Sequence, residues 1–313
     1  MKKYIRKYKL FFVLASIILI VCLVDILFGM FIDSYSKKHS LPGDYAKIEY
    51  LMNASDEDMI IVGSSNAINA FIPSTIEDRL NITCFNGGCN SQLLPFSQCM
   101  IENILKRHKP SQIILTIRAD ELSLRTMWRI NLLNVYYHKG NKSIDYFIDI
   151  NNGYKTIFLA SNLYRYNTIA WRMLLSYVAS VSEMGDKGYI PHDVPPIAPV
   201  LNDYSSVYEN VQLNSFKVNC FLEIIDMCKD AGTNLIVVIP PVYHIFYHDE
   251  KPADLKELER ICAENGIPLI NDSQSSFFLE RPELFYDNNH LNHIGTEIYT
   301  NIFIDRLKRI IEE

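Results

Sequence analysis

Five short runs rich in apolar residues recur along the chain, separated by stretches in which apolar side chains follow helical spacing. The runs are residues 59–65, 82–88, 112–118, 234–241 and 267–273. Runs of this length without polar alternation are typical of parallel strands that are buried on both faces. Parallel strands need a crossover between them, and the helical stretches supply it. The pattern therefore predicts an α/β domain with a doubly wound, five-stranded parallel sheet.

The expected helices have apolar residues at intervals of three and four. They cover residues 45–52, 74–80, 95–109, 214–231, 253–265 and 294–311. Gly232 and Gly266 directly follow two of them, as expected of C-terminal caps. In open parallel sheets, functional groups gather at the carboxyl ends of the strands. The segments after the first two strands and the loop before the last helix are therefore expected to meet.

Residues 10–32 form an apolar run that follows five basic residues in the first nine positions. At about 1.5 Å per residue, this run is long enough to cross roughly 30 Å of hydrocarbon. No small-residue cleavage site follows it, which favours an uncleaved membrane anchor over a signal peptide. The basic flank predicts a cytoplasmic N-terminus, with the rest of the chain outside the cell membrane. Asp25 is costly inside the run. It either faces a partner helix, or it is protonated or reaches the interface.

These features predict three segments: a basic stub with its anchor at 1–32, a juxtamembrane segment at 33–56, and an α/β domain at 57–313. Residues 122–213 interrupt the alternation of strands and helices. This stretch is rich in Tyr and Asn, with a helical pattern at 168–181 and a proline-rich loop at 189–199. We interpret it as one insertion, a cap over the strand ends that shapes substrate access.

Charge and cysteine usage exclude several classes of protein. The formal net charge is −6 although the N-terminus is basic, so the outer domain is acidic and nucleic-acid binding is disfavoured. Seven cysteines show no zinc-type spacing, and mostly buried thiols are expected. His244 and His248 beside Asp249 suggest a metal pair, but a solvated or substrate-facing loop is favoured. No metal and no cofactor is predicted, and no phosphate-binding or dinucleotide-binding glycine motif follows a strand.

Two segments carry residues suited to nucleophilic catalysis. Ser65 ends the first predicted strand in IIVGSSNAINAF, and Asp287 precedes His290 by three residues in a loop before the last helix. An imidazole accepts a serine proton when a carboxylate bonded to its other N–H fixes the tautomer. Taken alone, Gly-Ser-Ser also fits an ordinary turn, and Asp-x-x-His also fits a helix-capping Asp beside a surface histidine.

Together the two segments resemble the SGNH/GDSL hydrolase superfamily. GSSNA is similar to its Gly-Asp-Ser block, with Ser65 at the nucleophile and Ser64 in place of the Asp. DNNHLNHIG is similar to its last block, D-x-x-H-L-N-x-x-G. The resemblance covers roughly residues 57–312, with 122–213 poorly matched. It implies a flavodoxin-like fold and a catalytic triad of Ser65, His290 and Asp287.

Two further blocks of that superfamily are altered here. Where the family uses a glycine N–H after the second strand to bind the oxyanion, this chain has CFNGGCNSQ. The resemblance therefore implies an oxyanion hole made by Ser65 together with Gly87, Gly88 and Ser91.

The family also places an asparagine after the third strand, but this chain has Asp120, preceded by Arg118. A carboxylate repels an oxyanion, so the third donor is missing, moved or replaced. One lost donor costs about 10²–10³ in rate. Asn66, Arg118 and Asp120 are expected to contact the substrate.

The expected function is that of a serine-dependent acyl ester hydrolase or O-acyltransferase acting on a cell-envelope or exported glycan. Its expected partners are an acylated glycan or polysaccharide, a membrane acyl-donor protein and, through residues 10–32, the membrane. The same residues serve hydrolysis and transfer. The altered blocks leave open a second hypothesis, a non-catalytic accessory protein that binds a glycan or holds an assembly complex.

Overall fold

The computed structural model describes residues 2–36, 43–123, 130–178, 185–209 and 211–312. The chain divides into two compact units. One comprises Met1–Tyr45 with Asn131–Val181, and the other comprises Ala46–Ile130 with Ser182–Glu313. The segment expected as a single insertion, 122–213, is thus shared between the two units, and its central part groups with the N-terminal helix.

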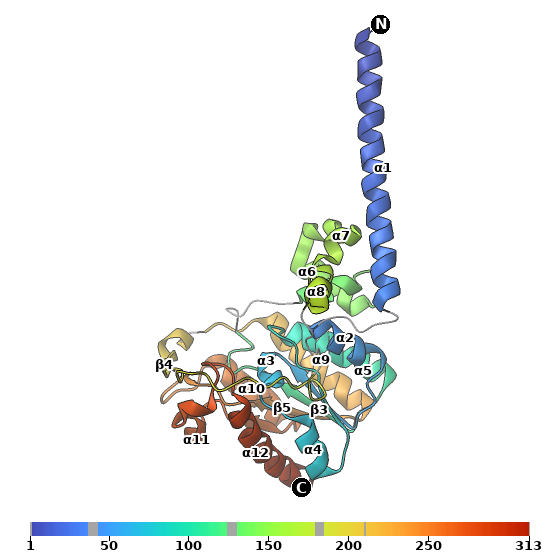
Figure 1. The fold of residues 1–313 in the computed structure, drawn as a ribbon. Coiled ribbons are helices and arrows are strands. Elements are labelled where there is room, and N and C mark those ends of the chain that lie inside the picture. The colour runs from blue at the N-terminus through green and yellow to red at the C-terminus, as the bar shows by residue number, and fades with distance from the viewer. Residues whose placement is uncertain (1, 37–42, 124–129, 179–184, 210, 313) are drawn as a thin grey trace. The chain divides into compact units, whose positions relative to one another are not determined.

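The second unit contains the predicted five-stranded parallel sheet (Figure 1). Its strands are β1 (Met59–Gly63), β2 (Cys84–Asn86), β3 (Gln112–Thr116), β5 (Asn234–Ile239) and β7 (Leu269–Asn271). Their order is β2-β1-β3-β5-β7, and every pair is parallel. This is the flavodoxin-like order, in which the chain reverses its direction across the sheet beside β1. The prediction of a doubly wound α/β fold is confirmed.

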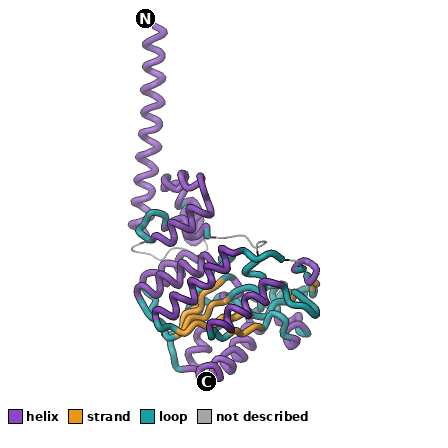
Figure 2. The backbone as a smooth tube through the Cα atoms, turned by 180° about the vertical axis from the view of Figure 1, so that it is seen from behind, coloured by secondary structure: helices purple, strands orange, loops and turns teal. Residues whose placement is uncertain are grey.

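Helices cover both faces of this sheet (Figure 2). On one face α5 (Leu94–Arg107) packs on α9 (Ser215–Ala231), and both contact the strands. On the other face α4 (Pro73–Leu80) packs on α12 (His293–Glu312). The helix between β5 and β7 is α10 (Ala253–Asn265). Gly232 and Gly266 adopt left-handed conformations at the ends of α9 and α10, as predicted.

The core between the sheet and α12 is rich in aromatic side chains. Phe71 lies 4.8 Å from Phe303 and 5.8 Å from Tyr299, measured between ring centroids, and all three are fully buried. Edge-to-face pairs of this kind add to the free energy gained by burying the rings. This packing holds α12 against the segment that follows β1, so the two ends of the unit are fixed to each other.

Short elements complete the second unit. They are α2 (Asp44–Asn53), α3 (Ser65–Ile68), β4 (Asn202–Asp203), η3 (Ser205–Tyr208), β6 (His244–Ile245), α11 (Ser276–Leu279) and η4 (Pro282–Leu284). Of these, only α2 was expected as an element. The strands β4 and β6 form a separate parallel pair.

The first unit is helical. It contains α1 (Lys2–Ser36), η1 (Asn131–Tyr136), α6 (Lys142–Asn152), η2 (Gly153–Ala160), α7 (Asn162–Arg165) and α8 (Asn167–Val178). Residues 179–181 of the helix predicted at 168–181 lie outside the described residues. Within α1, Tyr8–Ser36 is long and apolar enough to cross a membrane. All seven cysteines are free thiols, and all except Cys22 are buried, as predicted.

Candidate active site

Ser65 lies where β1 turns into α3. Ser64 caps this helix, and its Oγ accepts a hydrogen bond from the Asn66 N–H at 3.3 Å. The preceding Gly63 is required by close packing, since a Cβ there would lie 2.5 Å from the Thr116 carbonyl oxygen on β3. The turn leaves Ser65 partly exposed, while its neighbours Ser64 and Asn66 are buried. The first strand thus presents one hydroxyl at its carboxyl end.

His290 and Asp287 lie in a tight loop before α12. The Tyr286 N–H donates to the His290 carbonyl at 2.9 Å, which closes the loop. Asp287 Oδ1 accepts from the N–H groups of Asn289 at 2.7 Å and His290 at 3.0 Å. The backbone of its own loop therefore holds the Asp287 carboxylate in place, in addition to its contact with the imidazole.

The rest of the D-x-x-H-L-N-x-x-G segment anchors this loop. Asn292 is fully buried, donates to the Glu283 carbonyl at 2.7 Å and accepts from the Gly295 N–H at 3.0 Å. A Cβ at Gly295 would lie 2.1 Å from the Leu284 carbonyl oxygen, so no larger residue fits. Leu291 is buried in the core. These residues fix the start of α12, and with it the position of His290.

The structure brings Ser65, His290 and Asp287 into one chain of hydrogen bonds. Ser65 Oγ lies 2.7 Å from His290 Nε2, and His290 Nδ1 lies 2.9 Å from both oxygens of Asp287. A carboxylate only accepts, so the ring proton lies on Nδ1 and leaves Nε2 as the acceptor for the serine hydroxyl. This is the arrangement that activates a serine nucleophile.

Asp287 is held in its charged form. Burial alone would raise the pKa of this carboxyl. The hydrogen bond and charge of His290, with the N–H groups of Asn289 and His290, outweigh burial and bring the pKa below its ordinary value. An ionised Asp287 can therefore stabilise an imidazolium at His290 throughout the neutral range.

The loop after β2 differs from the expected oxyanion hole. The Gly87 N–H donates to the Ile61 carbonyl at 2.8 Å, and the Gly88 N–H donates to Asn86 Oδ1 at 3.1 Å. Both donors are thus engaged within the protein. Ser91 lies in an exposed turn with a left-handed φ of 61°. The N–H of Ser65 has no acceptor among the described residues, and as the first residue of α3 it is a free donor.

Asp120 is neutralised by Arg118. The guanidinium contacts both carboxylate oxygens, at 2.7 and 2.9 Å, and Tyr208 adds a long contact of 3.4 Å. Burial would lower the pKa of Arg118, but the ion pair raises it above its ordinary value. The ion pair carries no net charge. Asp120 would therefore not repel an oxyanion as strongly as a lone carboxylate would.

A small pocket adjoins the triad residues. It is lined by Asn66 and Asn289, the neighbours of Ser65 and His290, and by Arg118, His244 and Phe246. Its volume of about 10 Å³ is close to the minimum for one water molecule.

His244 supplies an acceptor in this pocket. Its Nδ1 donates to the Asn288 carbonyl at 3.1 Å, and its Nε2 is buried and has no partner among the described residues. Burial lowers the pKa of His244, so the neutral ring offers Nε2 as a bare acceptor. Of the two alternatives for the loop of His244, the solvated one is wrong for this residue, which is 3% exposed, and the substrate-facing one stays a prediction.

A second histidine, His192, lies beside the triad. Its ring stacks on Tyr286, with centroids 4.3 Å apart and planes 10° apart, and lies 6.0 Å from the His290 ring. Burial lowers the pKa of His192, and the nearby His290 adds to the effect. No local pattern in the sequence predicts these contacts, because they join segments almost a hundred positions apart.

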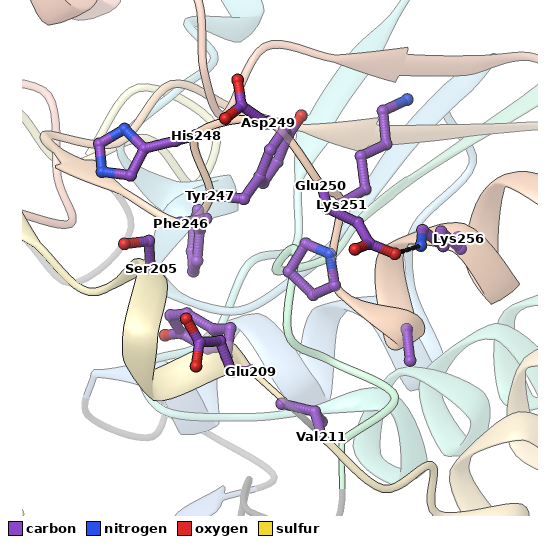
Figure 3. A pocket seen from close by; sticks show the side chains of 13 residues that line it. Ser205, Glu209, Val211, Phe246, Tyr247, His248, Asp249, Glu250, Lys251 and Lys256 are labelled. Carbon is purple, nitrogen blue, oxygen red and sulfur yellow. Dashed lines mark hydrogen bonds and ion pairs between the residues drawn. The ribbon is translucent and has the colours of Figure 1, made fainter.

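A larger cavity of about 620 Å³ lies next to the small pocket, and Phe246 lines both (Figure 3). Its other lining residues include Tyr208, Tyr247, Glu209 and Asp249. Aromatic faces and carboxylates together suit a polyhydroxylated ligand, which offers both C–H groups and hydroxyls.

His248 is solvated, as expected, and its Nε2 lies 2.8 Å from Asp203. In the part of the chain that the structure describes, no three His, Cys, Asp or Glu side chains are close enough to hold a metal ion.

No family model and no curated protein matches the chain. Similar solved structures include a lipase/acylhydrolase from Enterococcus faecalis, 11% identical with a TM-score of 0.36 over 80% of this chain and 95% of that one. Another is a gut microbial diltiazem-metabolizing enzyme, 12% identical with a TM-score of 0.38 over 80% of this chain. This chain covers 46% of that enzyme.

Proposed function

We propose that this protein is a serine-dependent esterase or O-acyltransferase of the SGNH/GDSL superfamily, acting on an acylated glycan or polysaccharide of the cell envelope. The observation that carries the proposal is the hydrogen-bonded chain from Ser65 through His290 to Asp287. Its distances meet the requirement for general-base activation of a serine without any rearrangement. The motifs that resemble the superfamily contain these same three residues.

In the first half-reaction, Ser65 Oγ attacks the ester carbonyl while His290 Nε2 takes the serine proton. Asp287 keeps the Nδ1–H oriented and stabilises the imidazolium. The carbonyl oxygen becomes an oxyanion, and the Ser65 N–H is available to bind it. His290 then returns the proton to the departing alkoxide oxygen. The alcohol leaves, and an acyl ester remains on Ser65.

In the second half-reaction, His290 removes a proton from water or from a sugar hydroxyl. The resulting oxygen nucleophile attacks the acyl-enzyme, and His290 protonates Ser65 Oγ as it leaves. Water gives hydrolysis, and a sugar hydroxyl gives transfer. Neutral His192 lies 6.0 Å from His290, where it can contact the incoming hydroxyl without adding a positive charge.

The substrate is expected to bind in the small pocket and in the larger cavity next to it. His244 Nε2 can accept one substrate hydroxyl in the small pocket beside Asn66. Tyr208, Phe246 and Tyr247 offer aromatic surface in the larger cavity. A glycan chain satisfies both features, because each sugar ring carries apolar C–H faces and hydroxyl donors.

The membrane location is part of the same proposal. Helix α1 is long and apolar enough to span a membrane, and the five basic residues at its start favour a cytoplasmic N-terminus. The catalytic unit then faces the outside, where an acyl-donor protein in the membrane supplies the acyl group.

The test uses the purified full-length chain in nanodiscs with an O-acetylated polysaccharide. Acetate release and acetyl transfer to a soluble oligosaccharide are both measured. We expect one or both activities in the wild type and in Ser276→Ala, which changes an exposed serine of α11, and neither in Ser65→Ala. Equal turnover by the wild type and Ser65→Ala would refute serine catalysis.

One observation favours the accessory role as a second candidate. The N–H groups of Gly87 and Gly88 are already bonded within the protein, so the oxyanion hole has fewer free donors than the family pattern provides. An accessory protein would bind the polysaccharide equally well as wild type and as Ser65→Ala, with no acyl turnover by either form.

A further inference from the structure

The last third of α1 carries a polar and small-residue face. Asp25, Gly29 and Asp33 are spaced four residues apart, so they lie on one side of the helix. Phe28 and Ile32 flank this face and are also covered, whereas Leu27 and Met30 on the other side are exposed. The covering elements belong to the same unit as α1, and α7 packs directly against it (Figure 1).

Asp25 is bonded entirely by this chain. Its carboxylate accepts from Ser161 Oγ at 2.6 Å, from the N–H groups of Asn162 at 3.0 Å and Leu163 at 2.9 Å, and from Asn162 Nδ2 at 3.3 Å. Asp25 therefore faces a helix of its own chain, α7.

Two further contacts hold the same surfaces together. A Cβ at Gly29 would lie 2.5 Å from Asn162 Cγ, so the absent side chain is what lets α7 approach. Asp33 Oδ1 accepts from Lys139 Nζ at 2.9 Å and from the Tyr166 hydroxyl at 3.0 Å. The part of the unit that carries Lys139, Asn162 and Tyr166 is thus fixed to α1 over about two helical turns.

The position of Asp25 along α1 sets the depth of α7. A rise of about 1.5 Å per residue places Asp25 about 22 Å from Leu10, where the apolar run begins. The hydrocarbon core is about 30 Å thick. Asp25 then lies about 8 Å below the outer hydrocarbon boundary, and a tilted helix would place it deeper. Residues bonded to Asp25 must lie at the same depth.

The elements next to Asp25 have the surface that this depth requires. In η2 and α7, five large apolar or aromatic side chains are exposed: Tyr154, Ile157, Phe158, Leu163 and Tyr164. Tyr154 is 83% exposed and Ile157 is 72% exposed. Five exposed apolar or aromatic side chains within two short neighbouring elements are unfavourable in water but favourable in lipid, and tyrosines are enriched at the membrane interface.

We propose that η2 and α7 are embedded in the outer leaflet of the bilayer alongside α1, with Asp25 bonded inside the protein and the patch of Tyr154, Ile157, Phe158, Leu163 and Tyr164 facing lipid. This deepens the proposed membrane location and is independent of the serine chemistry. The segment η2–α7 is then inserted in the membrane and is not part of a water-exposed cap. It continues the apolar surface of α1 sideways into the leaflet.

The test places a single tryptophan in the patch. Trp128 and Trp171 are replaced by phenylalanine, Ile157 is replaced by tryptophan, and the full-length chain is reconstituted in phosphatidylcholine vesicles. Lipids brominated near the headgroup end of the acyl chains should quench Ile157→Trp strongly, and aqueous acrylamide should quench it weakly. The matched control, Ile311→Trp on α12, should show the reverse.

A second variant tests the docking itself. Gly29→Leu adds a side chain where no Cβ fits, so the tryptophan at position 157 should lose bromolipid quenching and gain acrylamide quenching. A tryptophan at 157 that acrylamide quenches as strongly as the control would overturn the inference. Release of the chain by alkaline carbonate would refute the anchor and the inference together, while labelling of Ser65 in the same sample would show that the serine site is intact.

Discussion

Replacing Asp287 by asparagine should slow acylation of Ser65 by about 10³–10⁴-fold. The charge acts on His290 Nδ1 across 2.9 Å. At that distance two unit charges interact by about 1.4 kcal/mol in water and by about 6 kcal/mol at the effective dielectric constant of a protein surface. The Asp287 side chain is 45% exposed, so we place the loss between these limits, at roughly 3–4 kcal/mol.

Geometry adds to the loss of charge. Oδ1 already accepts from two backbone N–H groups, so an asparagine would keep its oxygen there and place its NH₂ where Oδ2 now lies. That NH₂ would lie beside His290 Nδ1 as a donor, and the retained oxygen, which is also 2.9 Å from Nδ1, would have to accept from three N–H groups. The hydrogen bond that fixes the ring would be weaker, and the tautomer with its proton on Nε2, which cannot accept from Ser65, would be more populated.

The assay is the rate of fluorophosphonate labelling of the full-length chain, followed on a fluorescent gel. Asp226→Asn removes an exposed carboxylate from α9 and should label at the wild-type rate. If Asp287→Asn also labelled at that rate, the proposed orientation of His290 by Asp287 would be wrong.

Three further predictions follow from buried polar groups. Lys47→Met should lower the free energy of unfolding by roughly 2–5 kcal/mol, seen as a lower Tm, because the carbonyls of Gly88 and Gly188 lose their buried donor; an unchanged Tm would contradict this. Burial, together with the nearby charge of Asp120, raises the pKa of Asp254 from 3.8 to about 6. The folded state favours the protonated form of Asp254. Its contribution to the free energy of unfolding is therefore greatest below pH 4, and up to about 3 kcal/mol of it is lost as the pH rises through about 6. Asp254→Asn should raise Tm at pH 7 and remove that part of the pH dependence. His244→Phe should raise KM for a glycan ester about 2–10-fold while labelling by a small probe stays unchanged; an equal fall in both would mean that His244 supports the triad itself.

The fold could be predicted because its signals are local. Each central strand is a continuous apolar run, such as MIIVG and QIILT, and the intervening helices have regular spacing and glycine caps. The candidate triad was also predicted, since a serine after the first strand and an Asp-x-x-His before the last helix are short patterns. Bringing them together required only the topology of the sheet.

The remaining parts of the site depend on contacts that no local pattern reveals. His192 reaches Tyr286 and His244 reaches Asn288 across long stretches of sequence. Whether the Gly88 N–H is free depends on the rotamer of Asn86. Strands of two residues, such as β4 and β6, are too short to show periodicity.

The bonding of Asp25 to α7 was not predicted either. The sequence showed a carboxylate in an apolar run, but its donors come from residues more than a hundred positions later. The grouping of 131–181 with α1 follows from these tertiary contacts.

The central claim, that His290 activates Ser65 as a nucleophile, is tested most directly by mass spectrometry of the fluorophosphonate-treated protein. We predict one covalent adduct on the peptide that contains Ser65 in the wild type, and its loss in His290→Ala that remains folded. An adduct that persists unchanged in His290→Ala, or its absence from a folded wild-type chain, would contradict the account.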